Sequence, residues 1–334
     1  MRVLQIVRPG EAEWTEAPVP QPGLGEVLVK VLGVTTCPHW DIHLMDGEPM
    51  FPGAELEYPL TPGQPGHEMV GDVIEIGPGV ESPVVGDRVA AWRDRGTKVS
   101  QGCYAQYVAF DADCLLVVPR DLEVDAIASL ELAMCVHVTF DQLAKFGGVR
   151  GKRVGVAGLG PAGLIAVQMA RSYGASQVVG IDPLPGRRQT ALELGAHETT
   201  AADEVEFPPG RQDPLGLDVA IDATGLKPAI EFLVDRTREV VAIFGVLRET
   251  IELTAARTRG GFALMGYAAH NLGAAERALA LIESGDVQLA PLVTHRLPLS
   301  QYAEGVALLR AREATKILFT AADRRIPAGA HRRN

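Results

Sequence analysis

The first third of the chain alternates short apolar segments with turn-forming residues. Residues 1–115 contain the segments EVLVKVLGV, MVGDVIEIG, RVAAW and YAQYVAF, separated by glycine and proline. Short valine-rich runs bounded in this way are typical of β-strands. The pattern therefore predicts a β-rich region over residues 1–115.

The rhythm changes over residues 151–265. A strand-like segment, a glycine-rich turn and a helical segment follow one another in RVGVAGLGPAG, LIAVQMARSYGA and QVVGID. The alternation continues in LDVAIDATG, KPAIEFLVDR and EVVAIFG. Strands that alternate with helices indicate parallel β-α-β units. After about residue 270 we expect a helix, an extended segment, a second helix and a last strand.

Composition narrows the classes of protein. The chain has 334 residues, enough for two domains, and its 47% hydrophobic and 22% charged residues are typical of a globular protein. No apolar run approaches the roughly 20 residues that span a bilayer, so we expect no membrane partner. The net charge of -11 argues against a nucleic-acid partner, which would require a basic surface.

The N-terminus and the cysteines bear on the compartment. The N-terminal segment reaches acidic residues and prolines too early for a signal peptide. The four cysteines, at positions 37, 103, 114 and 135, are too few and too scattered for a disulfide framework. We therefore expect a protein of the reducing cytoplasm.

A glycine-rich turn fits the pattern G-x-G-x-x-G between a strand-like and a helical segment. Gly158 permits the tight turn, Gly160 allows the backbone to approach a pyrophosphate, and Gly163 allows the helix to pack closely on the strand. The anion would lie at the N-terminus of the helix, where free N–H groups favour it. The expected cofactor contacts at the turn are Gly158, Leu159, Gly160, Pro161, Ala162 and Gly163.

The second strand of this region ends in an acidic residue, Asp182, which lies 19 residues after Gly163. A carboxylate there accepts hydrogen bonds from an adenosine ribose and repels a 2′-phosphate, so NAD is favoured over NADP. Arg187 and Arg188 follow closely and keep NADP open, because arginine is the usual phosphate partner. We add Arg187, Thr224 and Gly245 to the expected cofactor contacts.

Three stretches of the chain offer metal ligands. The segment TTCPHWDIHL contains Cys37 with two histidines, the pair His67-Glu68 follows, and Glu131 lies in SLELAMCVH. A thiolate, an imidazole and a carboxylate with one open position would make a catalytic zinc site. Each signal is weak alone, and spacing does not tie the three stretches together.

The chain resembles the zinc-dependent medium-chain dehydrogenases, the superfamily of alcohol and polyol dehydrogenases, over essentially its whole length. The matching segments appear in order: GLGEVLVKVLGVTTC, PGHEMVGDVIEIGPGV, VGDRVA, GCYAQYV, the glycine-rich turn, DVAIDATG, RTRGGFALMGY and PLVTHRLPLSQYAEGVALLRAREATKILF. The resemblance implies an α/β protein with a GroES-like β-rich catalytic domain and a doubly wound Rossmann domain. We expect the catalytic domain at residues 1–132, completed by 267–334, and the NAD-binding domain at 133–266.

The resemblance also implies a ligand set for one catalytic zinc ion. Cys37, His67 and Glu131 match the three ligands, and Glu68 matches an acid that approaches the metal in relatives when water exchanges. Cys135 and His137 are the rivals of Glu131. The four-cysteine lobe of relatives is missing, because only RDRGTKVSQ lies between the segments GDRVAAW and GCYAQYV, so we expect no structural zinc.

The segment after Cys37 departs from its relatives, which carry a hydroxyl residue two positions after the cysteine. His39 occupies that position, and an imidazole can act there as a general base. His43 is the second candidate for this proton relay, and a lining residue of the cleft is the alternative for His39. Asp41 could support a ligand histidine. Lys316 matches a basic position that approaches the cofactor phosphates in some relatives.

These matches imply an oxidoreductase that transfers hydride between NAD(H) and an alcohol, polyol or sugar hydroxyl, with zinc as its metal. One alternative is a zinc-free enoyl or quinone reductase that uses NADPH. The other is a cofactor-binding relative without catalysis. The resemblance further implies a homodimer or homotetramer.

Overall fold

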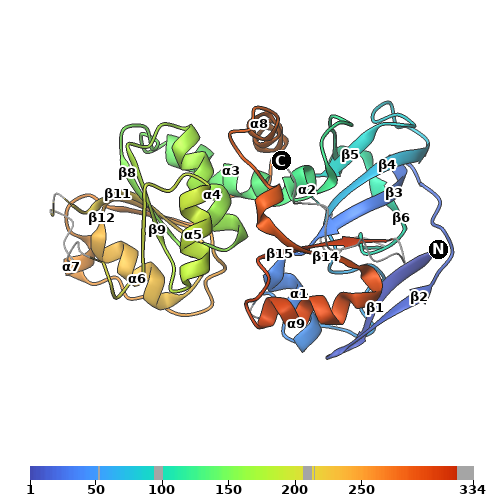
Figure 1. Cartoon of the computed structure of the whole chain (residues 1–334), viewed down its shortest axis with the longest axis horizontal. Coiled ribbons are helices and arrows are strands. Elements are labelled where there is room, and N and C mark those ends of the chain that lie inside the picture. The colour runs from blue at the N-terminus through green and yellow to red at the C-terminus, as the bar shows by residue number, and fades with distance from the viewer. Residues whose placement is uncertain (52, 94–100, 206–212, 214, 322–334) are drawn as a thin grey trace, which may run out of the picture. The chain divides into compact units, whose positions relative to one another are not determined.

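The computed structural model describes the chain except for residues 52, 94–100, 206–212, 214 and 322–334 (Figure 1). The described chain divides into two compact units. Unit 1 comprises Met1–Glu131 and the chain from Leu289 onward, and unit 2 comprises Leu132–Gln288. The first boundary, after Glu131, lies next to the expected one after residue 132. The second boundary, after Gln288, lies well beyond the expected one after residue 266.

The difference concerns helix α8 (Leu272–Glu283), which belongs to unit 2. Arg277 of this helix pairs with Asp141 at 2.6 Å. The side chain of Gln168 both donates to the carbonyl of Gln288 and accepts from its N–H. Such contacts within unit 2 join residues 267–288 to it, and an amphipathic helix pattern alone does not reveal which core a helix joins.

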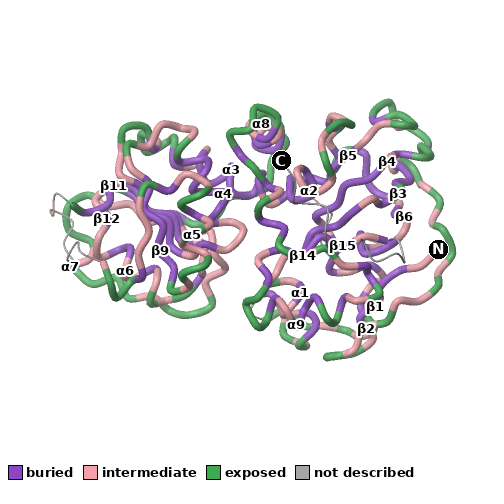
Figure 2. The backbone as a smooth tube through the Cα atoms, viewed as in Figure 1, coloured by how far each residue is buried: buried purple, intermediate pink, exposed green. Residues whose placement is uncertain are grey.

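Unit 1 contains the strands expected of the β-rich region, and they pair antiparallel except for β14 with β15. Strands β1 (Arg2–Arg8) and β2 (Glu11–Glu16) form a hairpin. A larger sheet has the order β14-β15-β3-β4-β5-β7, with β6 paired to β3. Its strands are β3 (Glu26–Thr35), β4 (Glu68–Ile76), β5 (Arg88–Ala91), β6 (Tyr107–Asp111), β7 (Leu115–Val117), β14 (Val293–Pro298) and β15 (Lys316–Thr320). Figure 2 shows that β3, β5 and β15 are largely buried.

The last described strand completes this sheet from far along the chain. β15 pairs antiparallel with β3, so that Leu318 lies opposite Thr35, and parallel with β14. The buried side chains of Tyr302 and Phe319 add to the same core. The start of β15 therefore lies beside the end of β3, where the segment TTCPHWDIHL begins.

Short helices complete unit 1. Helix α1 (Pro38–Asp46) begins with a proline, which is well suited to the first turn, and Cys37 is its N-cap residue. It ends at Gly47, whose φ of 80° is in the left-handed region that glycine adopts easily. The remaining helices are α2 (Val124–Ile127) and α9 (Tyr302–Arg310), with single turns at Ala112–Cys114, Ala290–Leu292 and Leu299–Gln301.

Unit 2 contains a parallel sheet of order β10-β9-β8-β11-β12-β13. The strands are β8 (Arg153–Ala157), β9 (Gln177–Ile181), β10 (Glu198–Thr200), β11 (Leu217–Asp222), β12 (Thr237–Ile243) and β13 (Ala263–Met265). The connecting helices are α4 (Pro161–Ser172), α5 (Pro185–Glu193), α6 (Lys227–Arg236) and α7 (Ala255–Thr258), and α3 (Leu130–Ala144) precedes β8. The order runs outward in both directions from β8 and β11, so the sheet is doubly wound.

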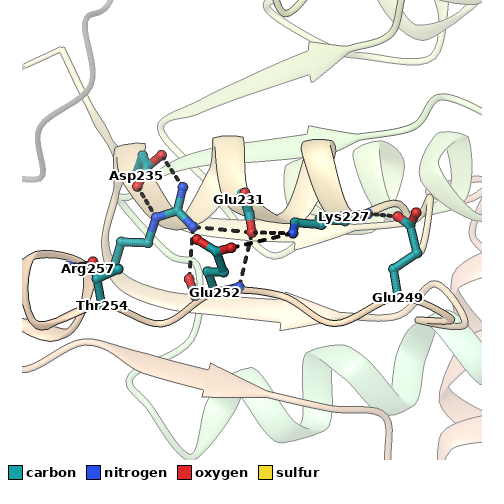
Figure 3. A network of polar contacts seen from close by, with 7 residues as sticks. All are labelled: Lys227, Glu231, Asp235, Glu249, Glu252, Thr254 and Arg257. Atoms are coloured by element: carbon teal, nitrogen blue, oxygen red, sulfur yellow. Dashed lines mark hydrogen bonds and ion pairs between the residues drawn. The ribbon is translucent and has the colours of Figure 1, made fainter.

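A polar network attaches the segment around α7 to helix α6 (Figure 3). Arg257 donates two hydrogen bonds to the carboxylate of Asp235, at 2.8 and 3.0 Å, and also pairs with Glu231 at 3.3 Å. Glu231 accepts from the backbone N–H of Glu252. These bidentate and shared contacts hold the loop before β13 against the helix.

No helix within the described residues has the length and apolar character needed to cross a membrane.

Candidate metal and cofactor sites

Three ligand-capable side chains meet at one end of the sheet in unit 1. Cys37 follows β3 directly, His67 precedes β4, and Glu68 is the first residue of β4. The pairing of Thr35 with Glu68 across the two strands brings these segments together. One ligand atom from each of Cys37, His67 and Glu68 lies within 4.8 Å of the other two. Residues 30 positions apart in sequence thus form one cluster.

Glu131 contributes from the start of helix α3. Its Oε2 lies 3.9 Å from Nε2 of His67. Ligands bound to one tetrahedral zinc ion at ~2.0–2.3 Å are separated by about 3.5 Å, so this spacing suits a shared metal. Thiolate, imidazole and carboxylate are also donor types that zinc prefers. His67 and Glu131 therefore fit a shared zinc ion, and Cys37 meets His67 from the other segment.

Cys37 and His67 hold their protons more firmly here than in water. His67 has Nδ1 2.8 Å from the carbonyl oxygen of Pro65, so Nδ1–H donates there and Nε2 is the nitrogen that faces Glu131. Burial raises the pKa of the Cys37 thiol above its ordinary value. Burial opposes a charge on His67, but the hydrogen bond with Cys37 and the charge of Glu131 outweigh it and raise the pKa of His67 well above its ordinary value. Metal binding at this cluster therefore releases protons.

Glu68 is paired with Lys316, the residue that was expected to contact the cofactor phosphates. Lys316 is fully buried, and its Nζ donates to Oε2 of Glu68 and to the carbonyl oxygen of Thr36, the latter at 2.7 Å. The hydroxyl of Thr35 also donates to Glu68 Oε2, at 2.9 Å. The expected contact of Lys316 with cofactor phosphates is therefore wrong for this structure, because an ammonium without accessible surface has no place for a phosphate.

The sequence pattern does not predict this buried network, which also includes Ser129 at 2.9 Å from Thr35. One signal was available. Lys316 opens the strand KILFT, an otherwise apolar segment in which a lysine is unusual. A buried lysine in such a strand requires an acidic partner, but the pattern does not say which one.

The remaining side chains of helix α1 point to separate environments. His39 is exposed, and its ring lies 6.1 Å from that of His43, which pairs with Glu48 at 3.2 Å. Asp41 is buried and accepts hydrogen bonds from the hydroxyls of Tyr104 and Tyr302 at 2.8 and 2.9 Å. The carboxylate of Asp41 therefore accepts from the two tyrosines, and the partner of the ligand histidine His67 is instead the carbonyl oxygen of Pro65.

Of the two rivals of Glu131, Cys135 lies in a second group of ligand-capable side chains that includes His270, and His137 contacts a tyrosine. Cys135 has its Sγ 3.3 Å from Nε2 of His270. His137 is buried, with Nε2 2.5 Å from the hydroxyl of Tyr173. Burial lowers the pKa of His137 below its ordinary value. Residues 93–101 stand where relatives carry the structural-zinc lobe, and most of them lie outside the described residues.

The glycine turn of unit 2 has the geometry that its pattern predicts. Gly158 has a φ of 87°, and a Cβ on Gly163 would lie 1.8 Å from the carbonyl oxygen of Gly158. A Cβ on Gly160, by contrast, would meet only Nη1 of Arg187, at 4.0 Å. The space beside Gly160 is therefore open, as the approach of a pyrophosphate requires. Pro161 begins helix α4, and Leu159 and Ala162 lie within the same turn.

Asp182 stands at the end of β9 beside this turn. Its Oδ2 accepts from the backbone N–H of Leu159 at 2.8 Å, and its Oδ1 accepts from that of Leu184 at 2.8 Å. Arg187 places Nη1 3.7 Å from Asp182 Oδ2. The expected acid, arginine and glycine turn thus lie together in unit 2.

Two further expected contacts end the neighbouring strands. Thr224 follows β11, and its hydroxyl and N–H both donate to Asp222. Gly245 follows β12, and its N–H donates to the carbonyl oxygen of Asp222 at 3.0 Å. The carboxyl ends of parallel strands are where ligands of doubly wound sheets bind.

Two domain families match the chain. The family described as alcohol dehydrogenase GroES-like domain matches residues 23–120, within unit 1. The family described as zinc-binding dehydrogenase matches residues 161–284, within unit 2. The cluster of Cys37, His67 and Glu68 lies in the first match, and the second begins within the glycine turn, at Pro161.

Curated relatives cover nearly the whole chain. L-threonine 3-dehydrogenase from Pyrococcus horikoshii is 27% identical over 352 residues, which cover 96% of this chain and 98% of the relative. (R,R)-butanediol dehydrogenase from Bacillus subtilis is 29% identical over 250 residues, which cover 67% of this chain and 70% of the relative.

Solved structures share the fold. The structure of 2R,3R-butanediol dehydrogenase from Bacillus subtilis has a TM-score of 0.82 and 23% identity, covering 96% of this chain and 99% of that one. A zinc-binding dehydrogenase from Sinorhizobium meliloti 1021, whose structure contains NADP, has a TM-score of 0.79 and 23% identity, covering 96% and 98%.

Proposed function

The chain belongs to the zinc-dependent medium-chain dehydrogenases, and from that premise we propose that it is an NAD-dependent dehydrogenase of an alcohol, polyol or sugar hydroxyl. The expected GroES-like and Rossmann fold is confirmed. The observation that carries the proposal is the meeting of Cys37 with His67, whose Nε2 also lies 3.9 Å from Glu131, in a chain that also has a dinucleotide turn.

We assign the metal to Cys37, His67 and Glu131. A zinc ion there would supply a Lewis acid that lowers the pKa of a substrate hydroxyl, or polarises a carbonyl in the reverse direction. The protein's own contribution is to hold the ligands in place. Pro65 fixes the His67 ring through Nδ1, and the two anionic ligands, Cys37 and Glu131, balance the charge of the ion.

His39 is the proposed acceptor of the proton that leaves the substrate hydroxyl. It lies two residues after Cys37 and is exposed, so it can pass a proton to solvent. Its neighbour His43, whose ring lies 6.1 Å away, extends this route along α1. We expect His39→Ala to slow turnover while leaving the zinc content unchanged.

NAD is the proposed cofactor, and it accepts the hydride at its nicotinamide. Asp182 supports this choice, because a carboxylate at the end of β9 binds a ribose diol and repels a 2′-phosphate. Arg187 supports NADP as the weaker alternative, since its guanidinium lies near Asp182 and the open space at Gly160.

The relatives suggest a small hydroxyl compound as substrate. Their names are those of threonine and butanediol dehydrogenases. In unit 1 the Trp40 ring lies 6.5 Å from that of His67 and 5.9 Å from the exposed Phe51. These rings give the surroundings of His67 an apolar side that suits the carbon chain of such a compound.

We further propose that the protein acts in a reducing compartment such as the cytoplasm and forms a homodimer or homotetramer. The four cysteines, all of which lie within the described residues, form no disulfide there, and Cys37 must remain reduced to bind a metal. The short strand β13 stands at the end of the sheet in unit 2, where a second copy could extend it.

A coupled screen tests the proposal. Purified protein is assayed with NAD+ and NADP+ against polyols, sugars and primary and secondary alcohols, with and without a chelator, and its bound metal is measured. We expect one zinc ion and chelator-sensitive reduction of NAD+. Absence of bound zinc with NADPH-dependent reduction of enones would favour the reductase alternative, and bound cofactor without turnover would favour a binding protein.

A further inference from the structure

A buried ion pair stands beside the candidate metal ligands. The side chains of Lys316 and Glu68 are both fully buried, and Nζ contacts Oε2 directly. Removing two charges from water is costly, and a pair of this kind contributes little net stability compared with apolar packing. The position of the pair, within the cluster that includes Cys37 and His67, points to a role in that site.

The pair engages only one oxygen of the carboxylate. Glu68 Oε2 accepts from Lys316 and from the Thr35 hydroxyl, whereas Oε1 is buried without a hydrogen-bond partner among the described residues. A carboxylate oxygen of Glu68 also lies within 4.8 Å of the ligand atoms of Cys37 and His67. Glu68 is thus close enough to become a fourth protein ligand after a small movement.

A fourth protein ligand would change the character of the site. Zinc held by Cys37, His67 and Glu131 keeps one position for substrate, whereas zinc with four protein ligands is a closed, structural site. An anionic side chain near a divalent cation is drawn toward it, and the attraction is strong when both are buried. Something must therefore restrain Glu68.

Lys316 has the geometry of such a restraint. Its Nζ donates to the carbonyl oxygen of Thr36, the residue before Cys37, at 2.7 Å. Thr36 is joined to Ile317 by two further hydrogen bonds, Ile317 N–H to Thr36 Oγ1 at 3.0 Å and Thr36 N–H to the Ile317 carbonyl oxygen at 2.9 Å. The ammonium is therefore fixed relative to the metal ligand.

We propose that Lys316 is a positioning residue that, with the Thr35 hydroxyl, holds Glu68 out of the fourth coordination position and so keeps the zinc site open for substrate. This inference rests on the zinc site of the proposed function. It replaces the cofactor contact first expected of Lys316. The chemistry belongs to the zinc, and Lys316 acts on it only through Glu68.

The test uses the full-length zinc protein and the variants Lys316→Met, Glu68→Gln and the double variant. Zinc loss to a chelator is timed, and imidazole binding to the cobalt-substituted proteins is followed by visible absorption. We expect Lys316→Met to lose zinc about tenfold more slowly, to bind imidazole at least about tenfold more weakly, and to have a lower kcat. The double variant should return to the behaviour of Glu68→Gln, because it lacks the competing carboxylate.

A matched control is Lys152→Met, which removes a lysine paired with Glu239 at 2.7 Å in unit 2 and should leave zinc loss and imidazole binding unchanged. Zinc loss from Lys316→Met that is as fast as in the wild type or faster, and equally fast in the double variant, would overturn the inference.

Glu68→Gln decides the matter if Lys316→Met does not fold. A restrained Glu68 predicts wild-type zinc loss and imidazole binding for this variant, whereas tenfold faster zinc loss would mean that Glu68 is a resident ligand and that the inference is wrong. A wild-type protein that binds no zinc overturns the proposed function itself.

Discussion

Two residues one helical turn apart are rival third ligands, and the structure keeps their ligand-capable atoms within 4.8 Å of each other. Glu131 and Cys135 both lie on α3, and either could be the third zinc ligand from its chemistry alone. Glu131 Oε2 lies 3.9 Å from His67 Nε2, whereas the Cys135 thiol is 3.3 Å from His270. The contact with His67, which itself meets Cys37, is the ground on which Glu131 is proposed.

Removal of the Glu131 carboxylate should abolish tight metal binding. Loss of a residue that merely supports a ligand costs 10–100-fold in affinity, so loss of the ligand should weaken zinc binding by more than about 100-fold. Metal analysis of Glu131→Ala after dialysis checks this. Cys135→Ser is the control and should retain its zinc, and the opposite pattern would move the ligand to Cys135.

The carboxyl group of Asp41 gives the folded state a specific pH dependence. Burial raises the pKa of Asp41 to about 6, although the two tyrosine hydroxyls oppose the shift. An unfolded aspartate has a pKa of about 3.9. The folded state therefore holds this proton more firmly, and the associated stability is present below about pH 4 and is lost as the pH rises through 6.

Asp41→Asn should remove this dependence. The difference between the folded and unfolded pKa values corresponds to about 3 kcal/mol. The free energy of unfolding of the wild type, measured relative to that of the variant, should fall by this amount between about pH 4 and 7. Asparagine can still accept the hydrogen bonds from Tyr104 and Tyr302. Denaturant unfolding at several pH values measures the difference, and the exposed Asp203→Asn should show no such trend.

At the scale of single elements, two glycines of the turn before α4 have different roles: Gly163 is needed for packing and Gly160 for binding of the cofactor. A Cβ on Gly163 would lie 1.8 Å from the Gly158 carbonyl oxygen, so Gly163→Ala must displace α4 from β8. Gly160 has a φ of -75° and nothing but the end of the Arg187 side chain near its Cβ position. Alanine is therefore sterically acceptable there until a cofactor binds.

We expect Gly160→Ala to keep the stability of the wild type within about 1 kcal/mol while weakening NAD+ binding at least about tenfold, since the methyl group occupies the path of the pyrophosphate. Gly163→Ala should instead lower the unfolding temperature by several degrees, because a backbone clash of this size destabilises the element. Calorimetry and NAD+ titration of both variants decide. Equal losses of stability would contradict the division of roles.

The sequence predicted these elements well where the signal is local. The turn at Gly158, the alternation of strands and helices and the acid at Asp182 all lie within about 30 residues, the size of one β-α-β unit. The pairing of β15 with β3 joins residues 283 apart, as in Leu318 and Thr35, and no periodicity encodes it. The misassignment of Lys316 follows directly, because its partner Glu68 is 248 positions away.

At the scale of the whole molecule, the proposed zinc ion and the proposed cofactor bind to different units. The proposed metal ligands Cys37, His67 and Glu131 all lie in unit 1, and the glycine turn and Asp182 lie in unit 2. A ligand that binds only the folded state stabilises the part that it binds. Metal and cofactor should therefore stabilise different units.

The tryptophans make this division measurable. All three, Trp14, Trp40 and Trp92, lie in unit 1, so their fluorescence reports on the unfolding of that unit. We expect removal of zinc by a chelator to lower the fluorescence-detected unfolding temperature, because the clustered carboxylates lose their counter-charge. NAD+ at a hundred times its Kd adds about 2.7 kcal/mol to unit 2, which calorimetry detects and tryptophan fluorescence does not. Equal shifts in both signals for each ligand would mean that the two units unfold as one.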